Sequence, residues 1–133
     1  MPQQTDPALP VRLSTVALQQ PSSKVRVAGR VSVPYNPPSP LIEISDGKHS
    51  LVVDVSLCLN PFQTAPWIRE RQAPVMFIGY LEPAKSSELR TDAGEEGGMM
   101  LLRAIVARSA DDLQLAIWDR AIQAREELEG FTN

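Results

Sequence analysis

The chain has little of the chemistry that metal sites and nucleophilic enzymes use. Its 133 residues include one cysteine, Cys58, and one histidine, His49. One cysteine cannot form an internal disulfide, and the two residues together fall short of the ligands of a structural zinc site. Cys58 lies between Leu57 and Leu59, which indicates a small buried hydrophobe, and no catalytic motif includes His49. We therefore expect no enzyme activity, no cofactor and no metal.

Charge and hydropathy argue against two further classes. Lys and Arg number 13 against 16 Asp and Glu, a net charge of -3, whereas a stand-alone nucleic-acid binder usually has a basic excess. No apolar run reaches the roughly 18 residues of a membrane helix, and the N-terminus lacks the basic-then-apolar order of a signal peptide. Hydrophobic residues make up 43% of the chain, which predicts one folded domain with no membrane contact.

Proline is confined to the first part of the chain, because all 12 prolines lie at or before Pro83. Residues 1–10 hold three of them and almost nothing to bury, which predicts a flexible tail followed by a single domain over 11–133. A second proline cluster, over 34–40, predicts a loop around Tyr35.

Five short strands are expected before a terminal helix. Valines alternate with polar residues over 24–33, with Gly29 in the middle, where a bulge or bend is expected. The other strands are expected at 41–44, 51–57, 75–81 and 99–107. This order, with a connector between the third and fourth strands, predicts an all-β OB-fold, a five-stranded Greek-key barrel with a C-terminal α-helix. The rival, a β-sandwich, usually needs about seven strands.

The C-terminal helix is expected at about 110–129, with Ser109 as its N-cap and Gly130 after its end. It has two apolar faces. One stripe consists of Leu113, Ile117, Ala121, Ala124 and Leu128, and the nearly opposite face carries Leu115, Trp118 and Ile122.

A terminal helix on a small barrel needs only one apolar face. The first stripe ends with the spacing of a coiled coil, and its alanines allow a second helix to approach closely. We assign this stripe to a partner and the other face to the barrel, with Trp118 plugging one end. The alternative is that the barrel covers both faces.

Basic residues offer a limited surface for nucleic acid. Single-strand binding combines a basic groove with aromatic platforms, yet residues 41–57 contain no aromatic side chain. The candidate contacts are Lys24, Arg26, Arg30, Tyr35 and Arg103. The alternative for the basic residues of the first strand is an ordinary solvated face.

The order of these segments resembles a known family. Residues 27–31 (VAGRV), 51–62, 77–81 (FIGYL) and 113–128 resemble successive segments of Ten-one, the smallest OB-fold subunit of the CST telomere-capping complex. Residues 44–47 (ISDG) also resemble the smallest subunit of replication protein A, which stays the alternative.

The resemblance to Ten-one implies a non-catalytic subunit in the nucleus, at telomeres. Such a subunit pairs with the N-terminal OB domain of the Stn subunit, joins the large single-strand-binding subunit and supports end capping and replication. Contact with telomeric single-stranded DNA would be weak or indirect. The partner-facing positions would be Leu113, Ile117, Ala121, Ala124 and Leu128. Lys24, Arg26 and Arg30 would contact the partner or DNA, whereas the acidic loop at 82–98 departs from shorter vertebrate forms.

Overall fold

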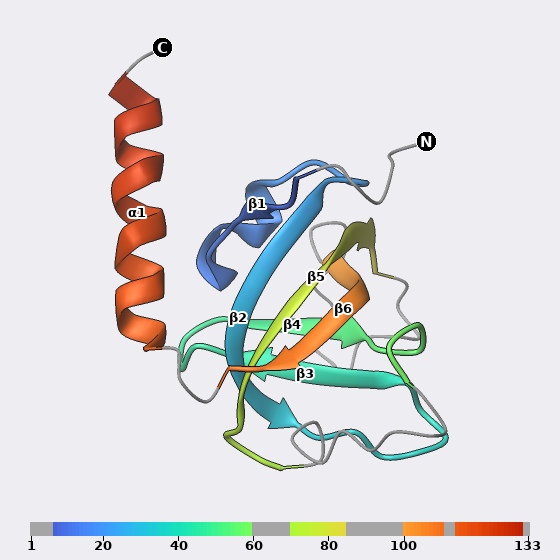
Figure 1. Ribbon diagram of the computed structural model, residues 1–133. Helices are drawn as coiled ribbons and strands as arrows, with labels where there is room; N and C mark the ends of the chain where they lie inside the picture. The colour runs from blue at the N-terminus through green and yellow to red at the C-terminus, as the bar shows by residue number, and fades with distance from the viewer. Residues whose placement is uncertain (1–6, 60–69, 85–99, 111–113, 132–133) are drawn as a thin grey trace.

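The computed structural model describes residues 7–59, 70–84, 100–110 and 114–131 (Figure 1). Within these described residues, six strands, a 3-10 helix and one α-helix follow one another. In order, these are β1 (Leu9–Pro10), η1 (Leu13–Leu18), β2 (Lys24–Val33), β3 (Leu41–Ser45), β4 (Ser50–Asp54), β5 (Pro74–Pro83), β6 (Met100–Ser109) and α1 (Leu115–Phe131).

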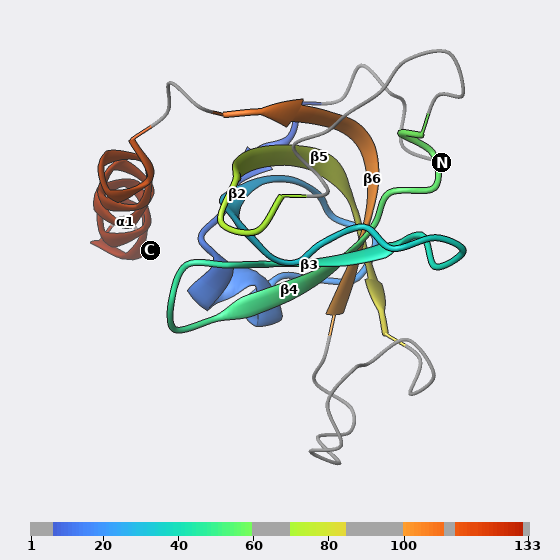
Figure 2. The same ribbon diagram turned by 90° about the horizontal axis from the view of Figure 1, so that it is seen from below.

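Strands β2 to β6 close into a barrel, seen end-on in Figure 2. The sheet order is β2-β3-β4-β6-β5, and β2 also pairs with β5, which completes the ring. All of these pairs are antiparallel except β4–β6, where Val52 lies opposite Leu101 in parallel register. This arrangement confirms the five-stranded OB-fold barrel with a C-terminal helix.

Strand β2 closes the barrel because it belongs to both halves of the sheet. It pairs with β5 from Lys24 to Arg30 and with β3 from Arg30 onward. Gly29 lies at this change of partner, and a Cβ there would stand 3.1 Å from Leu13 Cδ1 and from the Ser45 carbonyl oxygen. The irregular register lies farther on, between Val31 and Val33, so a bulge at Gly29 itself was the wrong expectation.

A second glycine is required where β5 crosses β6. The register of this pair is irregular between Ile78 and Gly79. A Cβ on Gly79 would overlap the carbonyl oxygen of Arg103 on the facing strand. Only a residue without a side chain allows the two backbones to approach this closely.

The barrel interior is filled by the apolar side of each strand. Fully buried residues include Val25, Val27, Val31, Ile42, Ile44, Val53, Phe77, Leu81 and Leu102. The alternation along β2 predicted its buried face well, because a strand turns successive side chains to opposite sides. At roughly 25 cal/mol per Å² of buried apolar surface, this interior supplies the main stabilisation of the fold.

The N-terminal segment belongs to the barrel. In β1, Leu9 and Pro10 lie parallel to Val25 and Arg26 of β2, and the backbone amide of Val11 donates to the Arg26 carbonyl oxygen at 3.0 Å. Val11, Leu13 and Val16 are buried in the core. Leu9 and Pro10, which were expected in a tail over 1–10, are therefore strand residues, and residues 1–6 lie outside the described part of the chain. Sequence alone missed this because two strand residues are too few for a periodic pattern.

The terminal helix begins later than expected. Ser109 ends strand β6, opposite Val75, and the backbone amide of Ala110 donates to the Pro74 carbonyl oxygen at 2.9 Å. Ser109 is therefore a strand residue rather than the N-cap, because pairing with β5 holds its backbone extended. Helix α1 starts at Leu115, and residues 111–113 lie outside the described part of the chain.

Helix α1 lies beside the barrel, next to β1 and η1 (Figures 1 and 2). Trp118 is only half-buried, so it does not plug the barrel as expected. Leu13 of η1 lies against Gly29 instead, and Val16 of η1 is buried in the same core. Within the described residues, no helix is long and apolar enough to cross a membrane.

Candidate functional site

The two apolar faces of α1 differ in exposure. On one face Ile122 is buried, with 5% of its surface exposed, and Leu115 and Trp118 are half-buried. On the other face Ile117 is 57% and Leu128 67% exposed. Ala121 and Ala124 between them are exposed as well, and Leu113 lies outside the described residues. We call Ile117, Ala121, Ala124 and Leu128 the exposed stripe; the described part of this chain leaves it open to solvent.

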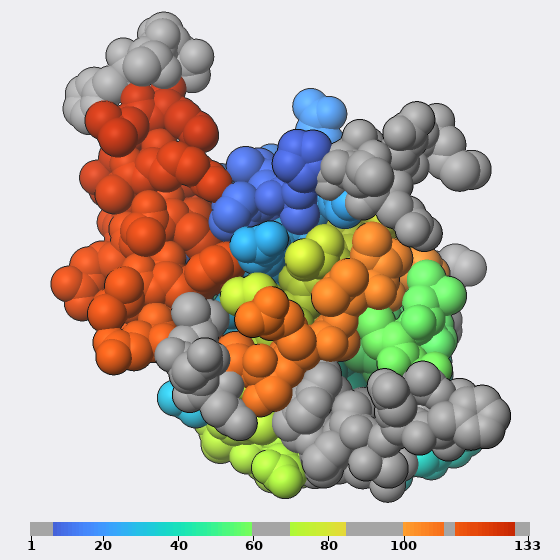
Figure 3. All heavy atoms as spheres, viewed as in Figure 1, coloured from blue at the N-terminus to red at the C-terminus, as the bar shows by residue number. Residues whose placement is uncertain are grey.

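Polar contacts attach the later turns of the helix to the N-terminal segment. Arg12 Nη2 donates to Glu126 Oε2 at 2.7 Å, and Arg12 Nε donates to Glu126 Oε1 at 3.5 Å. Thr15 Oγ1 adds a bond to Glu126 Oε1 at 3.4 Å, and Arg125 Nη2 donates to the Pro10 carbonyl oxygen at 2.7 Å. The hydrogen bond to Glu126 raises the pKa of Arg12. Helix and segment touch in the space-filling view (Figure 3).

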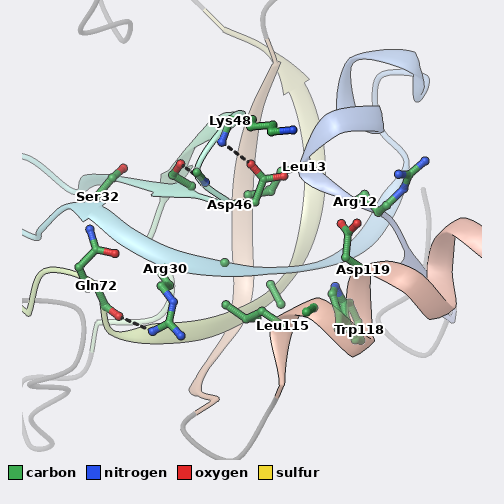
Figure 4. Close-up of a pocket in the computed structure, with 15 residues that line it drawn as sticks. Arg12, Leu13, Arg30, Ser32, Asp46, Lys48, Gln72, Leu115, Trp118 and Asp119 are labelled. Atoms are coloured by element: carbon green, nitrogen blue, oxygen red, sulfur yellow. Dashed lines mark hydrogen bonds between the residues drawn. The ribbon is translucent and has the colours of Figure 1, made fainter.

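A pocket of about 530 Å³ lies between the first turns of α1, strand β2 and the β3–β4 turn (Figure 4). Leu115 and Trp118 of α1 line one side, and Asp46 and Lys48 of the turn line another. Arg30 also lines it and donates from Nη1 to the Gln72 carbonyl oxygen at 3.0 Å. The N-terminal half of α1 therefore stands over a pocket, whereas its later turns are bonded to the barrel.

The turn at one side of this pocket is held by its own aspartate. Asp46 Oδ1 accepts hydrogen bonds from the backbone amides of Lys48 at 2.9 Å and His49 at 2.7 Å. Partial burial alone would raise the pKa of Asp46, but these bonds outweigh it and hold the pKa below its usual value. His49, which ends this turn, is exposed.

The candidate nucleic-acid residues do not form one surface. Lys24 of β2 is in register with Tyr80 of β5, and Tyr80 is in register with Arg103 of β6, so these three share a row across the barrel wall. Arg26 lies in the next row, opposite Ile78. Arg30 is separate, beside Gln72 and the pocket described above. Tyr35 is half-buried and packs against the core, and DNA contact by Tyr35 stays a prediction.

Arg103 lies between two carboxylates. Its Nε and Nη2 donate to the two oxygens of Glu82 at 2.7 and 2.9 Å, and its Nη1 donates to Asp54 Oδ2 at 2.7 Å. Asp54 is buried, with 6% of its surface exposed, and also accepts from the backbone amide of Ser56 at 2.9 Å. A phosphate at Arg103 would compete with both carboxylates, so DNA contact by Arg103 stays a prediction without structural support. Sequence reasoning missed this network because its members come from three strands.

The described part of the chain shows neither an activated thiol nor a cluster of metal ligands. Burial raises the pKa of the Cys58 thiol, with Asp54 adding to the effect, which disfavours a reactive thiolate. No three His, Cys, Asp or Glu side chains gather there as metal ligands would. What stands out instead is the exposed stripe, an apolar surface on α1.

Comparison with known proteins decides the family. Residues 2–130 match the model of a telomere-capping family of CST complex subunits. The chain belongs to this family. It is accordingly a non-catalytic, telomere-capping subunit, which favours the Ten-one resemblance over the replication protein A alternative.

Several solved structures share the fold of this CST subunit. A chain of the S. pombe Stn1–Ten1 complex has a TM-score of 0.64 and 17% identity, covering 95% of this chain and 98% of that one. The S. pombe telomere-capping protein Ten1 has a TM-score of 0.62 and 17% identity over 91% and 99% of the two chains. The E. coli protein ygiW has a TM-score of 0.51 and 12% identity over 77% and 91%. No protein of curated function matches the CST subunit in sequence.

Proposed function

We propose that this CST subunit forms a heterodimer with the N-terminal OB domain of its Stn subunit, through the exposed stripe of α1. One observation carries the proposal: Ile117 and Leu128 are more than half exposed on a helix whose opposite face is already docked. Large aliphatic side chains at helical spacing are typical of a surface that another helix covers. A chain of an S. pombe Stn1–Ten1 complex shares the fold, which supports this choice of partner.

The small residues of the stripe suit close helix packing. Ala121 and Ala124 lie between the two large side chains, and both are exposed. Alanines at these positions let a second helix approach while Ile117 and Leu128 fill its grooves. Leu113, the remaining predicted partner position, precedes the start of α1 at Leu115 and lies outside the described residues.

The pair would act at telomeres in the nucleus, together with the large single-strand-binding subunit of the complex. Direct DNA contact by this subunit is expected to be weak, because its net charge is -3 and its basic side chains are dispersed. Lys24 and Arg26 on β2 are the best-placed contacts. Substituting Arg26 and Arg30 by glutamate would lower any salt-dependent DNA affinity of the isolated chain.

Co-expression with the Stn N-terminal domain tests the proposal. We expect a 1:1 complex by light scattering, and we expect Ala124→Glu to abolish it because a carboxylate would be buried in the interface. Gln123→Glu is the matched control, since it adds the same charge at an exposed neighbouring position outside the stripe. Ala124→Glu protein that unfolds like wild type but still co-elutes with the partner would exclude the stripe as the interface.

A further inference from the structure

The contact of Arg12 with Glu126 holds α1 from the side opposite the exposed stripe. Glu126 follows Ile117 by nine positions, which places it about 180° around the helix. A partner seated on the stripe would therefore not touch Glu126. Any influence of the Arg12–Glu126 pair on partner binding must act through the direction of the helix.

The N-terminal segment is itself fixed to the barrel. Arg12 lies between Val11 and Leu13, which have exposed fractions of 1% and 6% in the core. The backbone of Val11 is bonded to β2 through the Arg26 carbonyl oxygen at 3.0 Å. The guanidinium of Arg12 is thus presented from a rigid base, and we refer to Leu9–Leu18 as the brace.

The apolar part of the helix attachment is small. Ile122 is the one side chain below a tenth exposed among the described residues of α1. The earlier turns stand over the 530 Å³ pocket that Leu115 and Trp118 line. Polar contacts to Arg12, Thr15 and Pro10 consequently decide much of how the helix is held.

We propose that the brace sets the direction in which α1 leaves the barrel, and that Arg12 and Glu126 are positioning residues for partner binding. The proposal rests on the proposed function, because it names what prepares the exposed stripe for the Stn domain. A helix held in its bound direction avoids the ordering cost of association. If only a fraction of molecules hold that direction, the apparent affinity falls by the same fraction.

Reversing the charges of Arg12 and Glu126, singly and together, tests the proposal in the full chain. We would measure hydrogen exchange of the α1 amides in the free protein, and calorimetric affinity for the Stn N-terminal domain. Arg12→Glu and Glu126→Arg should each speed exchange in α1 and weaken binding about fivefold. Combining the two reverses the pair and should restore both readouts to within about twofold. Glu70→Arg, the same charge change at an exposed position outside α1 and the brace, should leave both unchanged.

Each other result counts against the proposal. Unchanged exchange in the two single variants would overturn the brace, and a double variant as weak as the singles would overturn the direct pairing. Because hydrogen exchange is measured in the free protein, it tests the brace independently of the proposed function. A wild-type chain that never binds the Stn domain would overturn the proposed function and the effect on binding, whereas the exchange data would still decide whether the brace holds α1.

Discussion

The barrel and helix α1 bury their apolar side chains to very different extents. Ile44, in β3, is completely buried, whereas Ile117, in α1, is 57% exposed. The barrel is held by a continuous apolar interior, and the helix is attached mainly by one buried isoleucine and a few polar bonds. The barrel therefore buries its apolar side chains against one another, while the helix leaves much of its apolar surface exposed.

Truncating the barrel interior should have the largest effect. Ile44→Ala leaves a cavity in a closed core, so we expect a loss of about 2–5 kcal/mol in the free energy of unfolding. Urea denaturation measures it. The exposed Val106, on β6, offers the control, since Val106→Ala should change stability by less than about 0.5 kcal/mol. A small loss for Ile44→Ala would mean that the barrel core can collapse around the gap.

Breaking the Arg103 network should come next. Arg103→Met keeps roughly the length of the side chain but leaves the buried Asp54 without its cation. We therefore expect the free energy of unfolding to fall by about 2–3 kcal/mol. Thermal or urea denaturation provides the measurement. Arg108→Met, on the exposed end of β6, is the matched control. If Arg103→Met proved as stable as wild type but lost DNA binding, Arg103 would be a ligand contact rather than a structural residue.

Substitutions on the two faces of α1 should have smaller effects, and these effects should differ between the faces. Ile122→Ala should lower the free energy of unfolding by about 1–2 kcal/mol or speed hydrogen exchange in α1, because it removes the one deeply buried side chain of the described helix. Ile117→Ala should leave the stability of the free chain within about 0.5 kcal/mol of wild type and weaken partner binding instead. Equal stability losses for both substitutions would mean that the helix faces are not divided as described.

Some features were readable from particular residues. The alternating valines of β2 predicted its buried face. The spacing of Ile117, Ala121, Ala124 and Leu128 predicted an apolar stripe apart from Ile122, which the exposures confirm; that this stripe meets a partner stays a prediction. These features depend on local periodicity, which one segment carries by itself.

Other features needed the assembled molecule. Leu9 and Pro10 looked like a tail, yet they pair with β2, and Ser109 looked like a helix cap, yet it ends β6. Arg103 looked like a cation for DNA, yet it binds carboxylates from β4 and β5. In each case the deciding partner lies far away in the chain, so no local pattern contains it.

The sequence by itself determined the five strands, the closed barrel and a helix with two apolar faces, because alternation and helical spacing are local consequences of backbone geometry. The tertiary structure decided which helix face is docked, where the helix begins and what attaches it. Those outcomes depend on contacts such as Arg12 with Glu126, which are 114 positions apart in the sequence. Only the closed barrel brings such residues together, since it fixes the N-terminal segment beside the chain's last helix.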